Sequence, residues 1–234
     1  MSRTELDQAA EFDLFASRYD RLLDENLRRS GETAADFTRA RLRYLSRRLP
    51  LLPSRVMDFG AGIGLAIPHL LSALPGCTVT AVDISPASVH VATERFQDDP
   101  RVTVKLRSEF TPAGEFDMVY ASGVFHHIEP DARLEEAKFV LEVLRPGGVF
   151  VLAEHNPWNP VTRRLVGACA FDEMARLIRP SHARTLLRQA GFVNCRLDYT
   201  GFFSGPLKRL RPMERFLHLL PAGAQYVVIG RRGS

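Results

Sequence analysis

The chain has 234 residues, of which 45% are hydrophobic and 25% are charged, and its formal net charge at pH 7 is +4. This length fits one domain with terminal elaboration, and the composition excludes disordered and fibrous proteins. Residues 1–12 are polar and acidic, and no apolar run approaches the ~20 residues that cross a bilayer, so we expect no secretory signal and no membrane partner. The three cysteines are widely spaced, which predicts neither disulfides nor a zinc site and favours a cytoplasmic protein.

Apolar residues recur at helical spacing over residues 5–49, with a loop expected at residues 30–32. We therefore divide the chain into a helical N-terminal extension or lid at residues 1–50 and a larger unit at residues 51–234, which together make a single structural domain. The sequence leaves the oligomeric state, monomer or homodimer, open.

From residue 55 onward, short apolar strands alternate with helices. Strands are predicted at residues 55–59, 78–82, 102–106, 116–121 and 149–153, and helices at 65–74, 86–96 and 131–144. Ser85 is expected to cap the second of these helices, and residues 145–148 are a stop-and-turn signal that ends the third. Later predictions are a rigid, non-helical loop at 156–160, a helix at 181–190, a strand at 195–199, a short basic helix at 207–220 and a last strand at 225–230. Because the strands are apolar rather than alternating, the pattern predicts an α/β fold whose parallel sheet is covered by helices on both faces.

The most informative stretch is the loop after the first strand, where Gly60, Gly62 and Gly64 are spaced GxGxG. Glycines let the backbone turn sharply and let a ligand approach closely, and this strand–loop–helix context binds nucleotides at the carboxyl end of a sheet. Asp83 ends the next strand, where a carboxylate can accept hydrogen bonds from both ribose hydroxyls. Asp58 precedes the loop, and its charge suits a ligand that carries an ammonium and a sulfonium rather than a pyrophosphate.

The loop, read from Val56 to Gly64, resembles motif I of class I S-adenosylmethionine-dependent methyltransferases. Residues 83–85, 116–128 and 144–150 resemble later motifs of that superfamily in the same order, so the resemblance covers about residues 55–155. It implies a doubly wound, Rossmann-like sheet of seven strands, mostly parallel with the last strand antiparallel. It also implies S-adenosyl-L-methionine as cofactor, S-adenosyl-L-homocysteine as product, and methyl transfer to an oxygen, nitrogen or carbon atom of a small molecule in specialised, sugar or lipid metabolism.

The same resemblance implies a set of cofactor-binding residues. They are Tyr19, Asp58, Gly60, Ala61, Gly62, Asp83, Ile84, Glu109, Phe110, Ala121 and Ser122. Tyr19 lies in a segment like the one whose tyrosine closes over the cofactor in many small-molecule methyltransferases, and packing on the core is the alternative interpretation. Asp83 would hold the ribose, Ile84 would lie against adenine, and Glu109 matches a position that commonly contacts adenine.

Residues after the fourth and fifth strands are the candidates for chemistry, because methyl transfer needs an aligned nucleophile and, where that nucleophile must lose a proton, a base. We expect His155, His126 and Glu154 to be catalytic. His155 suits proton transfer at neutral pH, although Glu154 and Asn156 equally fit residues that pin the loop. His126 and His127 are expected to open a helix, with His126 facing the pocket. No metal site is expected, because these residues lack tight ligand spacing.

Three other functions compete with this interpretation. A nucleic-acid methyltransferase that acts on base nitrogens carries an Asn/Asp-Pro-Pro-aromatic motif after the fourth strand, which residues 121–124 do not match, so no nucleic-acid partner is expected. A nicotinamide-dependent oxidoreductase is disfavoured because Leu65 stands where its loop needs a glycine. A non-catalytic S-adenosylmethionine-binding partner protein stays open, because the loop predicts cofactor binding but not turnover.

Overall fold

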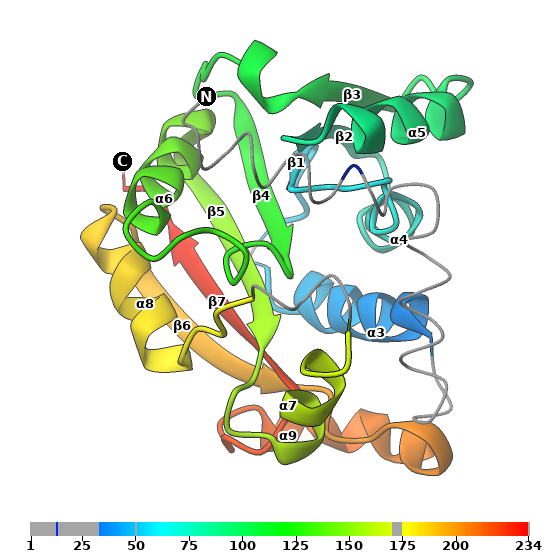
Figure 1. Cartoon of the computed structure of the whole chain (residues 1–234), viewed down its shortest axis with the longest axis vertical. Coiled ribbons are helices and arrows are strands. Elements are labelled where there is room, and N and C mark those ends of the chain that lie inside the picture. The colour runs from blue at the N-terminus through cyan, green and yellow to red at the C-terminus, as the bar shows by residue number, and fades with distance from the viewer. Residues whose placement is uncertain (1–12, 14–32, 50, 170–174, 234) are drawn as a thin grey trace.

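The structure is a computed structural model that describes residues 13, 33–49, 51–169 and 175–233 (Figure 1). Seven strands form one sheet in the order β3-β2-β1-β4-β5-β7-β6. They are β1 (Arg55–Phe59), β2 (Thr78–Asp83), β3 (Val102–Leu106), β4 (Phe116–Ser122), β5 (Leu144–His155), β6 (Val193–Thr200) and β7 (Gln225–Arg231). The pairs among β1 to β5 are parallel, and β7 is antiparallel to both β5 and β6. The predicted doubly wound, Rossmann-like sheet is therefore confirmed.

Helices cover both faces of this sheet (Figure 1). They are α3 (Ala34–Ser46), α4 (Ile67–Ala73), α5 (Pro86–Phe96), α6 (Arg133–Val143), α7 (Pro160–Val166), α8 (Pro180–Gln189) and α9 (Glu214–Leu217), with 3-10 helices η2 (Arg107–Glu109) and η4 (Gly205–Met213). One core cluster packs α6 and α8 against the sheet, and another packs α3 and α4. The central strands are buried from both sides, which explains their uninterrupted apolar sequences. Within the described ranges, no helix has the length and apolar character that a membrane span requires.

Local capping signals set the beginnings of two helices. The Oγ atom of Ser85 accepts the backbone N–H of Ser88 at 3.0 Å, so α5 begins where the sequence predicts. Thr33 and Asp36 form a reciprocal capping box at the start of α3, with the N–H of Asp36 donating to Thr33 Oγ1 at 3.2 Å. Of the predicted N-terminal extension, only residue 13 and residues 33–49 are described, and the division of the chain at residue 50 stays a prediction.

The Arg-Pro-Gly-Gly sequence at residues 145–148 does not precede the fifth strand as predicted. β5 already begins at Leu144, and its pairing with β4 shifts register between Phe116 and Met118. Gly147 has φ +78, which accommodates this irregularity inside the strand. The turn signal therefore distorts a strand instead of separating it from α6.

The predicted non-helical loop at residues 156–160 is confirmed for residues 156–159, and α7 begins at Pro160. Asn159 ends this loop and caps α7, since its Oδ1 accepts the N–H groups of Val161 and Thr162 at 3.0 Å each. The predicted basic helix at residues 207–220 is the 3-10 helix η4 followed by the single turn α9. Pro212 lies inside η4, and a proline, which has no N–H to donate, disfavours a continuous α-helix there.

Candidate functional site

The glycine loop after β1 adopts a backbone that only glycine takes easily. Gly60, Gly62 and Gly64 have φ values of +68, +54 and +80. A Cβ atom on Gly60 would lie 2.6 Å from a methyl carbon of Val124, whereas one on Gly62 would meet nothing within 4 Å. Gly60 is therefore required for packing, and Gly62 leaves open space at a position that lines a cavity.

Asp83 connects this loop to the end of β2. Its Oδ2 accepts the N–H of Gly62 at 2.7 Å, and its Oδ1 accepts the N–H of Ser85 at 2.9 Å. Burial raises the pKa of Asp83 and outweighs the backbone N–H groups, which lower it. The carboxylate is thus held in place at the carboxyl end of β2, where it lines the cavity.

Asp58, on β1, is buried with an exposed fraction of 3%. Within the described residues its Oδ2 atom has no hydrogen-bond partner. Burial and the nearby charge of Asp83 raise its pKa to about 7, although Arg41 opposes this shift. A buried carboxylate whose oxygen lacks a partner favours a cationic or hydrogen-bond-donating ligand. Asp58 therefore fits the ammonium end of S-adenosylmethionine.

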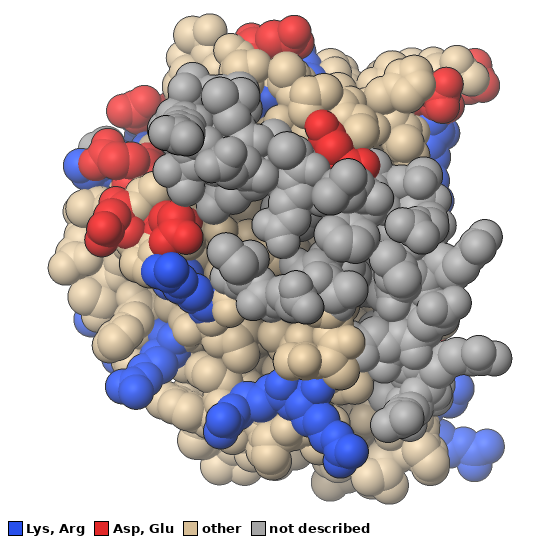
Figure 2. Space-filling model, viewed as in Figure 1, with Lys and Arg blue, Asp and Glu red and all other residues tan. Residues whose placement is uncertain are grey.

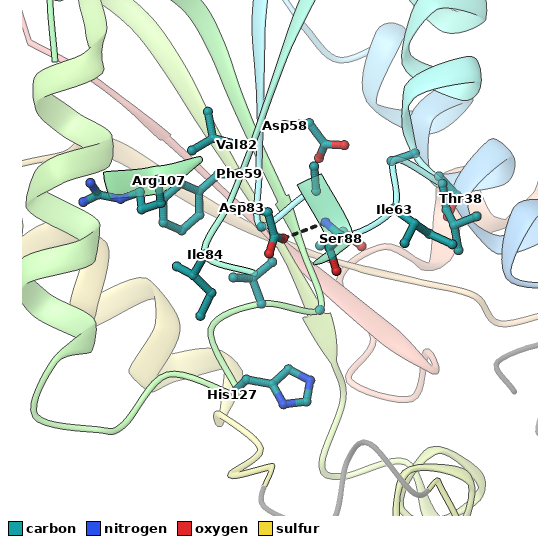
Figure 3. A pocket seen from close by; sticks show the side chains of 18 of the residues that line it. Thr38, Asp58, Phe59, Ile63, Val82, Asp83, Ile84, Ser88, Arg107 and His127 are labelled. Carbon is teal, nitrogen blue, oxygen red and sulfur yellow. Dashed lines mark hydrogen bonds between the residues drawn. The ribbon is translucent and has the colours of Figure 1, made fainter. Parts of the chain in front are cut away.

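A cavity of about 650 Å³ lies at the carboxyl ends of β1, β2 and β4 (Figure 3). Its walls include the glycine loop and residues of α3, namely Ala34, Ala35 and Thr38. Figure 3 shows Asp58 and Asp83 at neighbouring strands, with His127 farther along the cavity. The carboxyl edge of a parallel sheet is where ligands bind in doubly wound folds, and the volume suits a cofactor together with a small acceptor.

Most of the predicted cofactor residues line this cavity. They are Asp58, Gly60, Ala61, Gly62, Asp83, Ile84 and Ser122. Ala121 is fully buried in the core beside them. Glu109 is exposed and Phe110 is buried in the core, and the wall after β3 is formed instead by Arg107. Tyr19 lies outside the described residues.

The three residues expected to be catalytic lie next to the cavity but not on its wall. His126 and Glu154 are both buried, and His126 Nδ1 lies 2.5 Å from Glu154 Oε2. Glu154 Oε1 also accepts the N–H of Phe125 at 2.8 Å. The ring of His155 has its centroid 5.2 Å from that of His126. Of the two adjacent histidines, His127 lines the cavity and His126 does not, contrary to the expectation that His126 faces the pocket.

The electrostatics of Glu154 keep it ionised. Burial would raise its pKa, but the charge and hydrogen bond of His126, together with His155 and the Phe125 N–H, lower it below its ordinary value.

The histidine pair lies in a turn and not at a helix start, since the N–H of His127 donates to the carbonyl of Val124 at 3.0 Å and α6 begins only at Arg133. Among the described residues, no three His, Cys, Asp or Glu side chains gather as a metal site.

Sequence reasoning missed Arg41, which joins α3 to the cavity. Its exposed fraction is 5%, and its guanidinium donates to Tyr120 Oη at 2.9 Å, Gln225 Oε1 at 2.8 Å and Ser122 Oγ at 2.6 Å. Tyr120 and Ser122 belong to β4, and Gln225 is the first residue of β7. No sequence signal could have found Arg41, because an arginine in an amphipathic helix is usually solvated.

Comparisons with known proteins agree with this geometry. The profile of a family described as "Methyltransferase domain" matches residues 57–150. A ubiquinone biosynthesis O-methyltransferase of Xanthomonas euvesicatoria is 31% identical over 169 residues, which cover 64% of this chain and 67% of that protein. A 2-methyl-6-phytyl-1,4-hydroquinone methyltransferase of Synechocystis is 33% identical over 167 residues, covering 62% of this chain and 51% of the relative.

An uncharacterized protein of Synechococcus is 36% identical over 110 residues, which cover 43% of this chain. The chain spans only 26% of that protein's length.

A solved structure has the same fold. It is a crystal structure of an S-adenosylmethionine-dependent methyltransferase from Thermotoga maritima, described as a possible histamine N-methyltransferase, with a TM-score of 0.67 and 16% identity. The match covers 96% of this chain and 99% of the other. Together with the glycine loop, Asp58 and Asp83, these similarities show that the chain belongs to the class I S-adenosylmethionine-dependent methyltransferase superfamily of enzymes.

Proposed function

We propose that this protein transfers the methyl group of S-adenosylmethionine to a hydroxyl oxygen of a small aromatic acceptor. The observation that carries this proposal is the cavity that has Asp58 and Asp83 on one wall and His127 on another. The printed names of two relatives, an O-methyltransferase of ubiquinone biosynthesis and a methyltransferase of a hydroquinone, support an oxygen-bearing ring as the acceptor class.

Asp83 would hold the ribose hydroxyls and Ile84 the adenine, while Asp58 would pair with the ammonium of the methionine part. The glycine loop leaves room for the backbone to approach the ligand. The bound cofactor supplies an electrophilic methyl group on a sulfonium centre. What remains for the chain is to hold the acceptor oxygen in line and to remove its proton.

Two histidines line the cavity, His69 in α4 and His127 in the turn after β4. His127 fits proton removal from a hydroxyl better, because it lies beside the Glu154–His126 pair. Glu154 acts on it indirectly, since it binds Phe125 through the backbone and His126 through the side chain, the two residues that precede His127 in the turn. The rings of His126 and His127 lie 4.2 Å apart between centroids. We therefore assign His127 as the general base and treat Glu154 and His126 as positioning residues.

The first experiment is calorimetric titration with S-adenosylhomocysteine of the wild type, Asp83→Ala and the control Glu142→Gln, whose side chain is exposed and does not line the cavity. We expect binding that falls at least about tenfold in Asp83→Ala and is unchanged in Glu142→Gln. A folded wild type that binds no S-adenosylhomocysteine would contradict the assigned cofactor site.

A screen of hydroxylated aromatic compounds then tests the acceptor. S-adenosylhomocysteine should form with acceptors that carry a free ring hydroxyl and not with their methyl ethers. If only amines or carbon nucleophiles turn over, the assignment of an oxygen acceptor is overturned while that of the cofactor site stands.

A further inference from the structure

The segment between β6 and β7 carries a row of exposed apolar side chains, which we call the apolar stripe. Its members are Leu207, Leu210, Met213, Phe216 and Leu219, with exposed fractions of 54%, 41%, 52%, 69% and 71%. They are spaced three residues apart. In a 3-10 helix, residues at that spacing eclipse one another, so the members within η4 lie on one face.

The N-terminal end of α7 extends the stripe. Asn159 Nδ2 donates to the carbonyl of Ala222 at 2.9 Å, and Thr162 Oγ1 donates to the carbonyl of Ala224 at 2.9 Å. These bonds hold α7 against the chain that leaves α9, and Figure 1 shows the two helices together. Trp158 and Val161, which are 50% and 64% exposed, belong to this end of α7.

This concentration is not a scatter of single surface residues. Among the described residues, eleven large apolar side chains are strongly exposed, and eight of them belong to α7's start or to residues 207–220. Apolar side chains exposed singly are ordinary, whereas a concentration of them in one region of the surface marks a site that contacts something.

The exposed charged side chains of the segment that carries the stripe are all basic. Lys208, Arg209 and Arg215 are exposed, and Glu214 is the sole acid of residues 205–220. Its carboxylate is turned inward, where it accepts the N–H groups of Gly201 and Phe203 at 3.1 Å each. Figure 2 shows basic but no acidic residues over the lower part of this face, where α7, α9 and η4 lie in Figure 1.

We propose that the apolar stripe, with its flanking lysine and arginines, docks the protein on the surface of an anionic lipid bilayer. Exposed leucines and aromatics flanked by basic side chains are the composition of segments that lie in the membrane interface. A second copy of this chain is a poorer occupant, because a two-fold contact through this face would bring the basic side chains of both copies together. The absence of a long apolar run led us to expect no membrane partner, but surface docking needs no such run.

Docking here would bring the bilayer beside a wall of the cavity. The guanidinium of Arg211, in η4, lies over the ring of Phe37 with 5.9 Å to the ring centroid. Phe37 belongs to α3, and its chain neighbour Thr38 lines the cavity. The inference does not depend on the acceptor or on methyl transfer.

The test is sedimentation of the full chain with vesicles, either of pure phosphatidylcholine or of an equimolar mixture of phosphatidylcholine and phosphatidylglycerol. We expect most of the wild type to sediment with the mixed vesicles and only background amounts with pure phosphatidylcholine. Binding should weaken at about 1 M salt, where charges are screened beyond about 3 Å.

Two variants separate the contributions. Leu210→Ser/Phe216→Ser/Leu219→Ser removes apolar contacts, and Lys208→Glu/Arg209→Glu/Arg215→Glu reverses charge; each should lose at least about tenfold in vesicle affinity. Leu51→Ser/Leu52→Ser and Arg179→Glu/Arg188→Glu alter exposed residues elsewhere and should bind as the wild type does. Unchanged binding of S-adenosylhomocysteine verifies that each variant is folded.

Three results would overturn the proposal. A wild type that does not sediment with the mixed vesicles has no such docking surface. If the charge-reversed variant loses binding but the variant with serines in the stripe binds as the wild type does, the protein adsorbs non-specifically through its charge and the apolar stripe takes no part. A wild-type dimer in analytical ultracentrifugation that the leucine and phenylalanine changes dissociate would assign the face to a second copy.

Discussion

His126 and Glu154 form a buried pair, with His126 Nδ1 2.5 Å from Glu154 Oε2 and both side chains at most 2% exposed. The pair joins the turn after β4 to the end of β5, and the second oxygen of Glu154 holds the N–H of Phe125 in the same turn. The geometry of His127 on the cavity wall therefore depends on a carboxylate that does not line the cavity.

Glu154→Gln should destabilise the protein by about 3 kcal/mol at neutral pH, because breaking a buried charged pair leaves a polar group without its charge partner. The pKa of Glu154 is lowered from its ordinary value of 4.5, so its contribution to stability is present above that value and is lost as the pH falls through the lowered pKa. Urea denaturation over a pH series measures both effects. Glu135→Gln is the matched control, since Glu135 is 71% exposed and forms a surface ion pair with Lys138, and it should be nearly neutral. Equal stability of Glu154→Gln and wild type would contradict the role of the pair.

Asp58 should make cofactor affinity depend on pH. Its pKa is about 7 in the folded protein, so at lower pH its carboxyl must lose a proton before it can pair with an ammonium. Affinity for S-adenosylhomocysteine should rise by up to about tenfold per pH unit below that pKa and level off above it. Calorimetry between about pH 5.5 and 8.5 measures this slope, and Asp58→Asn should bind more weakly with no slope. An unchanged slope in Asp58→Asn would assign the proton to another group.

The same raised pKa should make folding stability fall with rising pH, whereas ligand affinity rises with pH. The folded chain holds the proton of Asp58 more tightly than the unfolded chain does, so stability without ligand should fall as the pH rises from about 4 to about 7. Asp58→Asn should remove this part of the decline in a thermal-melting series. If the variant and the wild type decline in parallel, Asp58 is not the buried proton acceptor.

Gly60 and Gly62 should respond differently to alanine. At Gly60, a Cβ atom would clash with Val124 in addition to the strain of a positive φ, so Gly60→Ala should cost about 3 kcal/mol of stability. At Gly62 the added atom meets open space, so the cost should be only the strain, about 1 kcal/mol. Because Gly62 lines the cavity, Gly62→Ala should nevertheless bind S-adenosylhomocysteine at least about tenfold more weakly. Normal ligand binding by a folded Gly62→Ala variant would place the ligand elsewhere.

Arg41→Met should loosen α3 from the sheet. The change removes hydrogen bonds to Tyr120, Ser122 and Gln225 and should cost about 3 kcal/mol. Since α3 forms a wall of the cavity, ligand affinity should fall as well. Arg39→Met changes an arginine of the same helix that is 49% exposed and should have little effect on either measurement. Similar unfolding midpoints for the two variants would show that Arg41 does not anchor α3.

His127→Gln should lower kcat by about 100-fold while leaving the affinity for S-adenosylhomocysteine unchanged, because a general base contributes to turnover and not to cofactor binding. It should also abolish the acidic limb of the pH–rate profile. His126→Gln should lower kcat but keep that limb, as expected for a positioning residue, and the exposed His182→Gln should be neutral. If His126→Gln and not His127→Gln removes the limb, the two roles are reversed.

The sequence alone determined the alternation of strands and helices, the order of the motifs, the glycine loop and the two carboxylates at the strand ends. The glycine loop and the two carboxylates depend on a short stretch of chain, because β1, the loop and β2 form one supersecondary unit. Its turns need glycine and its strands need apolar residues whatever the remainder of the chain does. Asp58 could be found because it lies two residues before the first glycine of the loop, and Asp83 could be found because it ends β2.

Only the tertiary structure decided which side chains meet across the fold. Arg41 contacts partners 79, 81 and 184 residues away in the sequence, and no local pattern encodes such contacts. The choice between His126 and His127 depends on Glu154, 28 residues from His126 in another strand, which draws one imidazole into the core and leaves the other on the cavity wall. The apolar stripe is exposed for a related reason: helices α3, α4, α6 and α8 already cover the two faces of the sheet, and the leucines after β6 are left outside.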